Sequence, residues 1–271
     1  MHYTLRQLEV FVAVAQHESV SHAARALAMS QSATSTALAE LERQFDCQLL
    51  DRIGKRLKLN ALGFQLLPKA VALLDRGEEI EELLRGQKGV GSLDVGATLT
   101  IGNYLATLLI SDFMQRHPGS RVRLAVRNTR HIIEGVRQHS LDLGLIEGQC
   151  DDDMIISQPW VEDELCVFCS PRHPLAGREH LELEQLLRED WIMREEGSGT
   201  RMTLEHAARH RRSRFNTLLE LEPELDLKRQ FTFIWHRHKY LTTGVREFLR
   251  LCREMTAGAK RSDDIALPPI P

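Results

Sequence analysis

The chain has 271 residues, with 35 basic and 38 acidic side chains, so its formal charge is −3 with the 12 histidines counted as neutral. This length allows about two domains, and a composition of 42% apolar and 27% charged residues is ordinary for a globular chain with a sizeable core. We find no apolar run long enough to span a membrane and no secretory signal at the N-terminus. The five thinly spread cysteines favour reduced thiols over a disulfide framework. We therefore expect a cytoplasmic protein that makes no membrane contact.

The first sixty residues predict three short helices followed by a hairpin. Apolar residues recur at helical spacing over residues 5–15, 23–27 and 37–45. Residues 49–59 are rich in basic side chains that alternate with apolar ones, and Gly54 is placed for the turn of a hairpin. Three helices followed by a basic hairpin is the order of a winged helix-turn-helix.

Polar residues at the start of the third helix match the chemistry of a DNA contact. Short hydroxyl side chains reach phosphates and base edges without bulk, and a glutamine amide can pair bidentately with adenine. Basic side chains on the hairpin need a partner, and the phosphate backbone is the natural one. The candidate residues are Ser30, Gln31, Ser32 and Ser35 on the helix, and Arg52, Lys55, Arg56 and Lys58 on the hairpin. The alternative is an ordinary small helical bundle with a polar surface.

A long helical pattern follows from the candidate cap Asn60 to about Leu84. It carries a coiled-coil seam with spacings of 4, 3, 4, 3 and 4, and such a seam requires a partner. The seam consists of Leu66, Ala70, Leu73, Gly77, Ile80 and Leu84. Pro68 is expected to kink or divide the helix, and the glycines at 86, 89 and 91 predict a linker or hinge.

After these glycines, strands and helices alternate. Strands are predicted over 93–97, 121–126 and 143–146, with helices over 101–115 and 131–138 between them. This β-α-β-α-β order predicts a parallel sheet. Further along the chain we expect a strand over 165–169, a helix over 181–187, a strand over 231–235 and a helix over 244–252.

The N-terminal segment, residues 1–65, resembles the DNA-binding domain of the LysR-type transcriptional regulators. The resemblance rests on Leu5–Phe11, Ser21–Leu27, Ser30–Ser35, Leu41-Glu42 and Leu50–Arg52, and it extends over nearly the whole chain. It implies a dimerising linker helix over 66–85 and, from residue 92, an effector domain similar to periplasmic solute-binding proteins. It also implies DNA contacts from a recognition helix and a wing, made by Gln31, Ser32, Ser35, Arg52, Lys55 and Arg56.

Two turns of the effector domain suit a small anion. Thr98 and Thr100 lie where a strand ends and a helix begins, so their hydroxyls and the N–H groups of the first helical turn would attract negative charge. The turn at Gly197–Thr200 is of the same kind. The resemblance places a co-inducer site at Thr98, Thr100, Asn103, Glu147, Gly148, Ser198 and Thr200. The alternative is that these threonine-rich strand ends and Gly-Ser-Gly turns are common loop features that bind no ligand. The best physical match for an effector is a small anionic metabolite or oxyanion.

One segment departs from the family pattern. After a strand such as 218–221, the family continues through a helix, a Gly-x-Gly turn and another strand, whereas Glu222 here leads through Pro223 directly into a later stretch. About 35–40 residues are absent, and a parallel unit that loses its middle exposes neighbouring strands. We predict an incomplete second subdomain in which effector binding is weakened or lost.

We therefore predict an α/β protein with three parts. These are an all-α winged helix-turn-helix over 1–60, a dimerising linker helix and hinge over 61–90, and a two-lobed α/β effector-binding domain over 91–271. The predicted function is a non-enzymatic, sequence-specific regulator of transcription that binds double-stranded promoter or operator DNA as a homodimer or tetramer under the control of a small co-inducer. The alternative is a sensor-defective paralogue that occupies DNA, or forms heterodimers, without responding to ligand.

No catalytic motif, cofactor or metal site is predicted. The pair Cys166 and Cys169 has zinc-like spacing, but it lies in a strand pattern and has no second cysteine pair. His236 and His238 share a strand face with no third ligand close by in the sequence.

Overall fold

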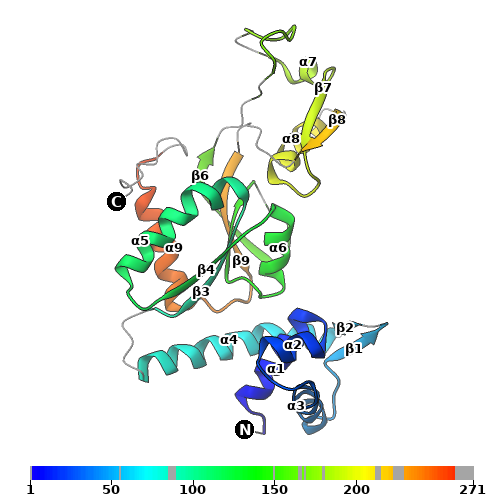
Figure 1. The fold of residues 1–271 in the computed structure, drawn as a ribbon, viewed down its shortest axis with the longest axis vertical. Coiled ribbons are helices and arrows are strands. Elements are labelled where there is room, and N and C mark those ends of the chain that lie inside the picture. Colours follow the sequence, from blue (N-terminus) through cyan, green and yellow to red (C-terminus); the bar gives the residue numbers. More distant parts are fainter. Residues whose placement is uncertain are drawn as a thin grey trace.

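The structure is a computed structural model. It describes residues 2–54, 56–84, 90–148, 150–163, 167, 169–178, 181–210, 215–221 and 229–259. An N-terminal helical domain lies at one end, the long helix α4 runs between it and an α/β body, and a smaller α/β part lies at the far end (Figure 1). Within the described ranges, no helix is both long and apolar enough to cross a membrane.

The N-terminal domain has the predicted order of three helices and a hairpin. Its elements are α1 (Leu5–His17), α2 (Val20–Ala26), α3 (Gln31–Gln44), β1 (Leu50–Ile53) and β2 (Arg56–Leu59). Thr4, Ser19 and Ser30 cap the three helices, because their hydroxyl oxygens accept hydrogen bonds from first-turn N–H groups. Ala23 is fully buried, which lets α2 pack closely against its neighbours. Gly54 turns the hairpin with a positive φ of 62°.

Helix α4 (Ala61–Leu84) is continuous over 24 residues and contains Pro68, so of the two expected effects of this proline, a kink or a division, the division does not occur. Its first half belongs to the N-terminal domain, because Leu67 and Ala70 are buried in that core. Gly77 also faces α1, since a methyl group there would lie 3.7 Å from Leu5 Cδ1. The predicted seam is thus divided: its first part packs within the chain, whereas Ile80 and its last member, Leu84, are exposed.

The first lobe of the effector domain is built on a five-stranded sheet in the order β4-β3-β5-β9-β6. The strands are β3 (Ser92–Ala97), β4 (Arg121–Val126), β5 (Leu143–Glu147), β6 (Ile155–Asp163) and β9 (Arg229–His236). Strand β3 pairs in parallel with β4 and β5, as predicted. Strand β9 returns antiparallel to both β5 and β6, so the sheet is mixed.

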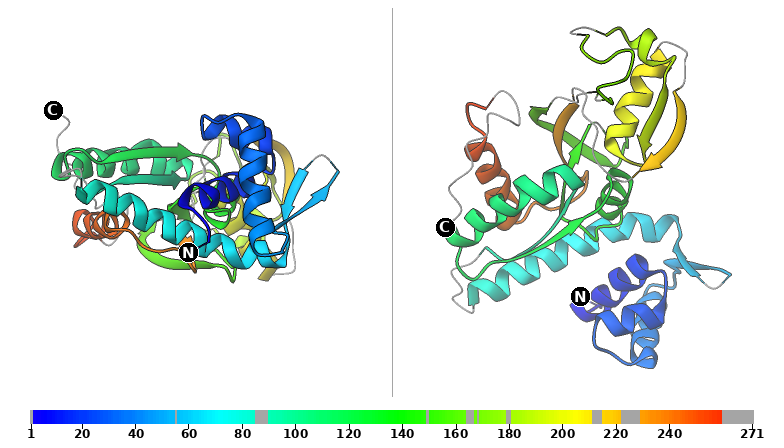
Figure 2. Two further views of the ribbon diagram at one scale, coloured as in Figure 1. Left: turned by 90° about the horizontal axis from the view of Figure 1, so that it is seen from below. Right: turned by 45° about the horizontal axis from the view of Figure 1, so that its top comes forward.

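Helices cover both faces of this sheet. The π-helix η1 (Ile101–Ala106) leads directly into α5 (Thr107–Arg116), which packs with α9 (Thr243–Met255) on one face, whereas α6 (Thr129–Arg137) covers the other (Figures 1 and 2). Phe113, Phe233 and Phe248 are fully buried on the α5–α9 face. Ile132 of α6 packs against Ile234 on the opposite face, so alternate residues of β9 supply both cores.

The second lobe is smaller in its described part. It contains α7 (Leu183–Leu186), β7 (Asp190–Arg194), α8 (Gly199–His210) and β8 (Asn216–Leu221), and its two strands pair in parallel. Its buried apolar cluster consists of Trp191, Met193 and Leu204. Three of the five residues of the predicted strand over 165–169, namely 165, 166 and 168, lie outside the described residues, and so does the predicted shortening at 222–228.

The linker helix is fixed to the first lobe by buried charges. The Lys239 ammonium lies 2.7 Å from both Asp75 of α4 and Asp142 of the lobe. Two further bonds reach Glu79 of α4, from the Tyr240 hydroxyl at 3.1 Å and the Thr243 N–H at 2.7 Å. Burial raises the pKa of Asp75 to about 6 although Lys239 opposes the shift. Burial would lower the pKa of Lys239, but the two aspartates raise it, so the lysine stays charged.

Candidate DNA-binding surface and effector site

The predicted helix residues share one exposed surface at the start of α3. Gln31, Ser32 and Ser35 are all exposed, and their spacing of three and four residues places them on one face. Thr34 is buried behind them and anchors the helix to the domain. Ser30 has a different position, because its hydroxyl accepts the Ala33 N–H at 3.1 Å as the helix cap. Its role at the DNA remains a prediction.

The hairpin carries its cations as predicted, but two of them have a partner within the chain. Arg52 and Arg56 are exposed on antiparallel strands, and Lys55 lies outside the described residues. The carboxylate of Glu18 pairs with Arg56 at 3.4 Å and also with Lys58. The phosphate backbone as their partner remains a prediction, and the structure adds a carboxylate within the chain for two of the cations. No local pattern signals this pairing, because Glu18 lies about forty positions before the hairpin.

The predicted effector residues meet where the two lobes touch. Thr98, Glu147, Ser198 and Thr200 are all buried, and they come from both lobes. The Thr98 N–H donates to the carbonyl oxygen of Leu145 at 3.0 Å, which joins the end of β3 to β5. A methyl group at Gly199 would lie 2.6 Å from the Glu147 carbonyl oxygen, so the start of α8 closes directly onto the end of β5.

The remaining predicted effector residues lie at the margin of this junction. Gly148 has a φ of 87° and faces α8, since a methyl group there would lie 3.5 Å from Thr203 Oγ1. Thr100 is half-buried at the start of the helix that follows β3, whereas Asn103 is exposed one turn further on. The structure therefore does not bury Asn103 with the other candidates.

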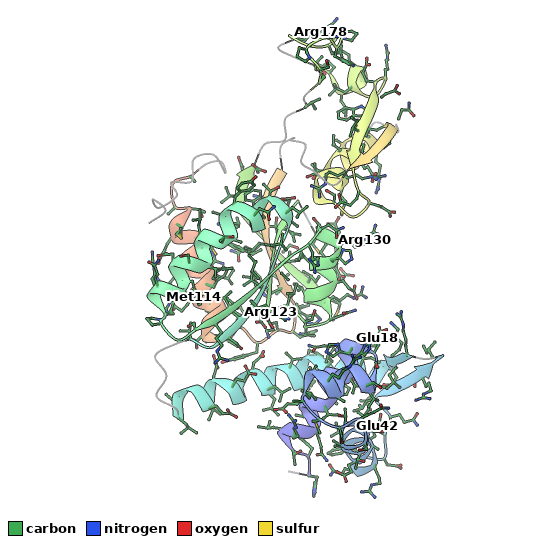
Figure 3. The ribbon with its side chains drawn as sticks, in the orientation of Figure 1. Glu18, Glu42, Met114, Arg123, Arg130 and Arg178 are labelled. Atoms are coloured by element: carbon green, nitrogen blue, oxygen red, sulfur yellow. The ribbon has the colours of Figure 1, made fainter. Side chains whose placement is uncertain are left out.

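The start of α6 belongs to the same junction and was missed from the sequence. A methyl group at Gly199 would lie 2.6 Å from Thr129 Oγ1, and that hydroxyl is buried with no hydrogen-bond partner among the described residues. The Arg130 N–H donates to the Gly197 carbonyl oxygen at 3.2 Å, and the Arg130 guanidinium lies 2.8 Å from Glu196. Figure 3 labels Arg130 beside α6. The available signal was Asn128, a helix-capping residue directly after a predicted strand.

The electrostatics of this junction combine two helix starts with a buried cation. The first turns of α6 and α8 lie side by side, and each carries partial positive charge. Arg194, at the end of β7, is 4% exposed and donates to Glu195 at 2.8 Å. Burial would raise the pKa of Glu195, but the hydrogen bond from Arg194 brings it below its ordinary value, so the pair stays ionised. The two helix starts favour negative charge, whereas the carboxylate of Glu147, buried at the same junction, opposes it.

Known proteins match this chain in both of its parts. Residues 5–64 match the model described as bacterial regulatory helix-turn-helix protein, lysR family, and residues 86–222 match the LysR substrate binding domain. The uncharacterized HTH-type transcriptional regulator YeiE of Escherichia coli K12 is 38% identical over 289 residues, covering 93% of this chain and 98% of that protein.

Solved structures share the fold. A full-length OxyR variant from Pseudomonas aeruginosa has a TM-score of 0.68 at 18% identity, with 96% of this chain and 97% of that chain covered. Full-length CbnR complexed with its target DNA has a TM-score of 0.52 at 19% identity, with 93% and 99% covered. Both likenesses concern the fold of full-length regulators.

The alignment with YeiE is longer than the part of this chain that it covers. Its 289 aligned positions hold 93% of the 271 residues of this chain, or about 252, so about 37 positions have no counterpart here. The match to the substrate binding domain ends at residue 222, where we predicted that the family pattern breaks. The chain belongs to the LysR family of DNA-binding transcription regulators, and not to a family of enzymes.

Proposed function

We propose that the chain binds specific promoter or operator DNA in the cytoplasm and that a small effector held between the two lobes controls this binding. The DNA contact is supported by one observation above all, the exposed face of α3 that carries Gln31, Ser32 and Ser35. Arg52 and Arg56 would add phosphate contacts from the hairpin. CbnR, which shares this fold, was solved on its target DNA.

A homodimer, or a tetramer built from dimers, is supported by the far end of α4. Ile80, Leu83 and Leu84 are 58%, 79% and 81% exposed there, beyond the part of the helix that packs within the chain. A contiguous exposed apolar surface of this kind indicates an interface. Pairing with the same residues of a second copy would cover it and set the spacing of the two DNA-binding domains.

The effector site is supported by the buried polar residues that the two lobes share. Thr98 and Glu147 come from the first lobe, and Ser198 and Thr200 from the second. The buried Thr129 hydroxyl, which lacks a hydrogen-bond partner in the described part of the chain, suits a ligand oxygen. A small anion placed there would contact both lobes and favour their closed arrangement.

The direct test of DNA binding is a gel shift with the DNA upstream of the protein's own gene at two salt concentrations. A specific shift that weakens with salt is expected, and the absence of either property would contradict the proposal. Ser35→Arg should abolish specific binding and Gln31→Ala should relax it. Arg56→Ala should instead weaken binding to all sequences alike.

A second candidate is a regulator that occupies DNA or forms heterodimers but has lost its sensor. The supporting observation is the set of about 37 positions of YeiE without a counterpart in this chain, obtained from 289 aligned positions and 93% of 271 residues. Thermal unfolding with inorganic phosphate, sulfate and small carboxylates distinguishes the two candidates. A saturable rise in Tm indicates an intact effector site, whereas no rise with any anion favours the sensor-defective protein.

A further inference from the structure

Glu18 occupies an unusual position at the end of α1. Its backbone adopts the left-handed conformation, with φ 52° and ψ 20°, as the C-cap of the helix. Glycine takes this conformation without strain, whereas in a glutamate the Cβ is repelled by the neighbouring backbone. Ala28, Asp46 and His139 also take a positive φ, so the conformation alone assigns no role and the contacts of the Glu18 side chain must carry the argument.

That side chain binds the DNA-contacting hairpin. The Glu18 carboxylate pairs with Arg56 at 3.4 Å through one oxygen and with Lys58 through the other. Arg56 and Lys58 are two positions apart on β2 and so point to the same face of the strand. Between them, the Leu57 N–H donates to the Glu18 carbonyl oxygen at 2.9 Å. One residue of α1 thus fixes three successive residues of the hairpin.

The exposure of the three side chains shows which of them is the anchor. The side chain of Glu18 is 22% exposed, whereas those of Lys58 and Arg56 are 44% and 73% exposed. The carboxylate is held against the domain, and the cations extend past it toward solvent. A phosphate that approaches the hairpin therefore meets two cations whose charge is already partly neutralised.

We propose that Glu18 is a positioning residue that restrains the hairpin cations and so raises the ratio of specific to non-specific DNA binding. The inference rests on the proposed DNA-binding function. Non-specific binding depends almost entirely on contacts between cations and phosphates, so a fixed carboxylate beside two of those cations weakens it most. At a specific site, the contacts of α3 with base edges remain, and a hairpin of fixed orientation reaches its phosphate in register.

The test is fluorescence anisotropy of the full chain on a specific duplex and on a scrambled duplex across a range of salt concentrations. Glu18→Gln keeps the size of the side chain but removes its charge. We expect non-specific affinity to rise about three- to tenfold at low salt, with a salt slope steeper by about 0.9 for each additional phosphate that the hairpin neutralises. Specific affinity should change less, so the specificity ratio should fall.

Two further variants separate charge from folding. Glu18→Gly removes the carboxylate that pairs with Arg56 and Lys58, and it also relieves the strain of the left-handed conformation. It should therefore raise non-specific affinity as Glu18→Gln does, without loss of thermal stability. Glu9→Gln is the matched control, because it removes one charge from the same domain at an exposed pair with Arg6 on α1. It should leave the salt slope unchanged.

Two results would overturn the proposal: an unchanged salt slope and specificity ratio in Glu18→Gln, or an equal response in Glu9→Gln. The second result would mean that net charge, and not the ion pairs of Glu18, controls binding. If the wild-type chain shows no specific binding, the proposed function fails, and the salt slope on scrambled DNA still decides whether Glu18 restrains the hairpin cations.

Discussion

The two lobes of the effector domain differ in how much core holds them together. On one face of its sheet, the first lobe buries 18 apolar residues in a single cluster, and it has a second cluster under α6. Among the side chains described in the second lobe, the buried cluster has three members. Burial of apolar side chains is the main favourable term in folding, so most of the stability of this domain lies in the first lobe.

The lobes also differ in what they are joined to. The first lobe is tied to the linker helix through Lys239 and through two hydrogen bonds to Glu79. The second lobe touches the first through the Arg130 pair with Glu196 and the close contact at Gly199. The DNA-binding half thus rests on the more stable lobe, and the effector junction depends on the weaker one. A lobe of low local stability is the part that moves when a ligand binds.

The largest expected effect comes from opening the first core. Phe233→Ala removes a fully buried ring that stacks on Trp160 and should cost about 3–5 kcal/mol of unfolding free energy. Met193→Ala, in the second lobe, should cost about 2 kcal/mol and affect that lobe alone. Hydrogen exchange by segment measures this: faster exchange should spread across the five-stranded sheet in the first variant and stay within residues 183–221 in the second. Equal effects on both lobes would show that they unfold as one unit.

The joint with the linker helix should give the next largest effect. Lys239→Met removes a cation whose side chain is 3% exposed and leaves the half-buried Asp75 and Asp142 without it, so it should destabilise the protein by about 3 kcal/mol in chemical denaturation. Lys69→Met is the matched control, because this lysine is exposed on α4, the helix that carries Asp75. It should change stability by less than about 0.5 kcal/mol. A loss of the same small size in both variants would show that the joint contributes little.

The sequence predicted much of the first lobe and missed specific parts for physical reasons. Strand β4 was predicted over its whole length, because polar and apolar residues alternate over its first four positions and its last two are apolar. Strand β6 was missed because Pro159 reads as a strand breaker. The structure tolerates this proline because β6 is the edge strand of the sheet, and its register shifts between Pro159 and Val161.

The candidate sites show the same division between local and distant information. Thr98 and Ser198 could be found because each lies at a local strand-to-helix or turn signal, and the structure buries both at the lobe junction. Thr129 was missed because its neighbour Asn128 marks only the start of a helix, and nothing local shows that the Thr129 hydroxyl packs against Gly199, seventy positions later. The ion pairs of Glu18 with the hairpin were missed for the same reason, since ion pairs between distant segments leave no periodic pattern in the sequence.

The first lobe also contains a buried histidine that should make its stability depend on pH. Burial lowers the pKa of His139 to about 3, and the neighbouring His236, Lys239 and His238 add to the shift. Because this folded pKa lies below the ordinary 6.5, the unfolded chain takes up a proton between pH 6.5 and 3 that the folded chain does not. His139 alone should therefore lower the stability by about 2 kcal/mol at pH 5.

His139→Asn tests this contribution, since asparagine tolerates the positive φ of 56° at this position. The free energy of unfolding is measured at pH 7.5 and pH 5, and the variant should gain about 2 kcal/mol relative to the wild type at the lower pH. Asp75 acts in the opposite direction, because its pKa is raised to about 6 and its protonation favours the folded state as the pH falls below that value. His2→Asn, at an exposed position, is the control and should leave the pH dependence of stability unchanged. If the stability of His139→Asn varied with pH in parallel with that of the wild type, the prediction would be contradicted.

The smallest change in stability should come from the contact between the lobes, where the effect on function should be large. Gly199→Ala places a methyl group 2.6 Å from both the Glu147 carbonyl oxygen and Thr129 Oγ1, so the lobes must separate slightly. The cost should be about 1 kcal/mol, at the low end for overpacking, because the small lobe can move as a body. Any rise in Tm that an anion gives the wild type should be lost.

Arg130→Ala is the control, because it removes only the exposed ion pair with Glu196 and should keep that rise in Tm. Equal responses of the two variants to anions would show that the Gly199 contact does not form the effector site.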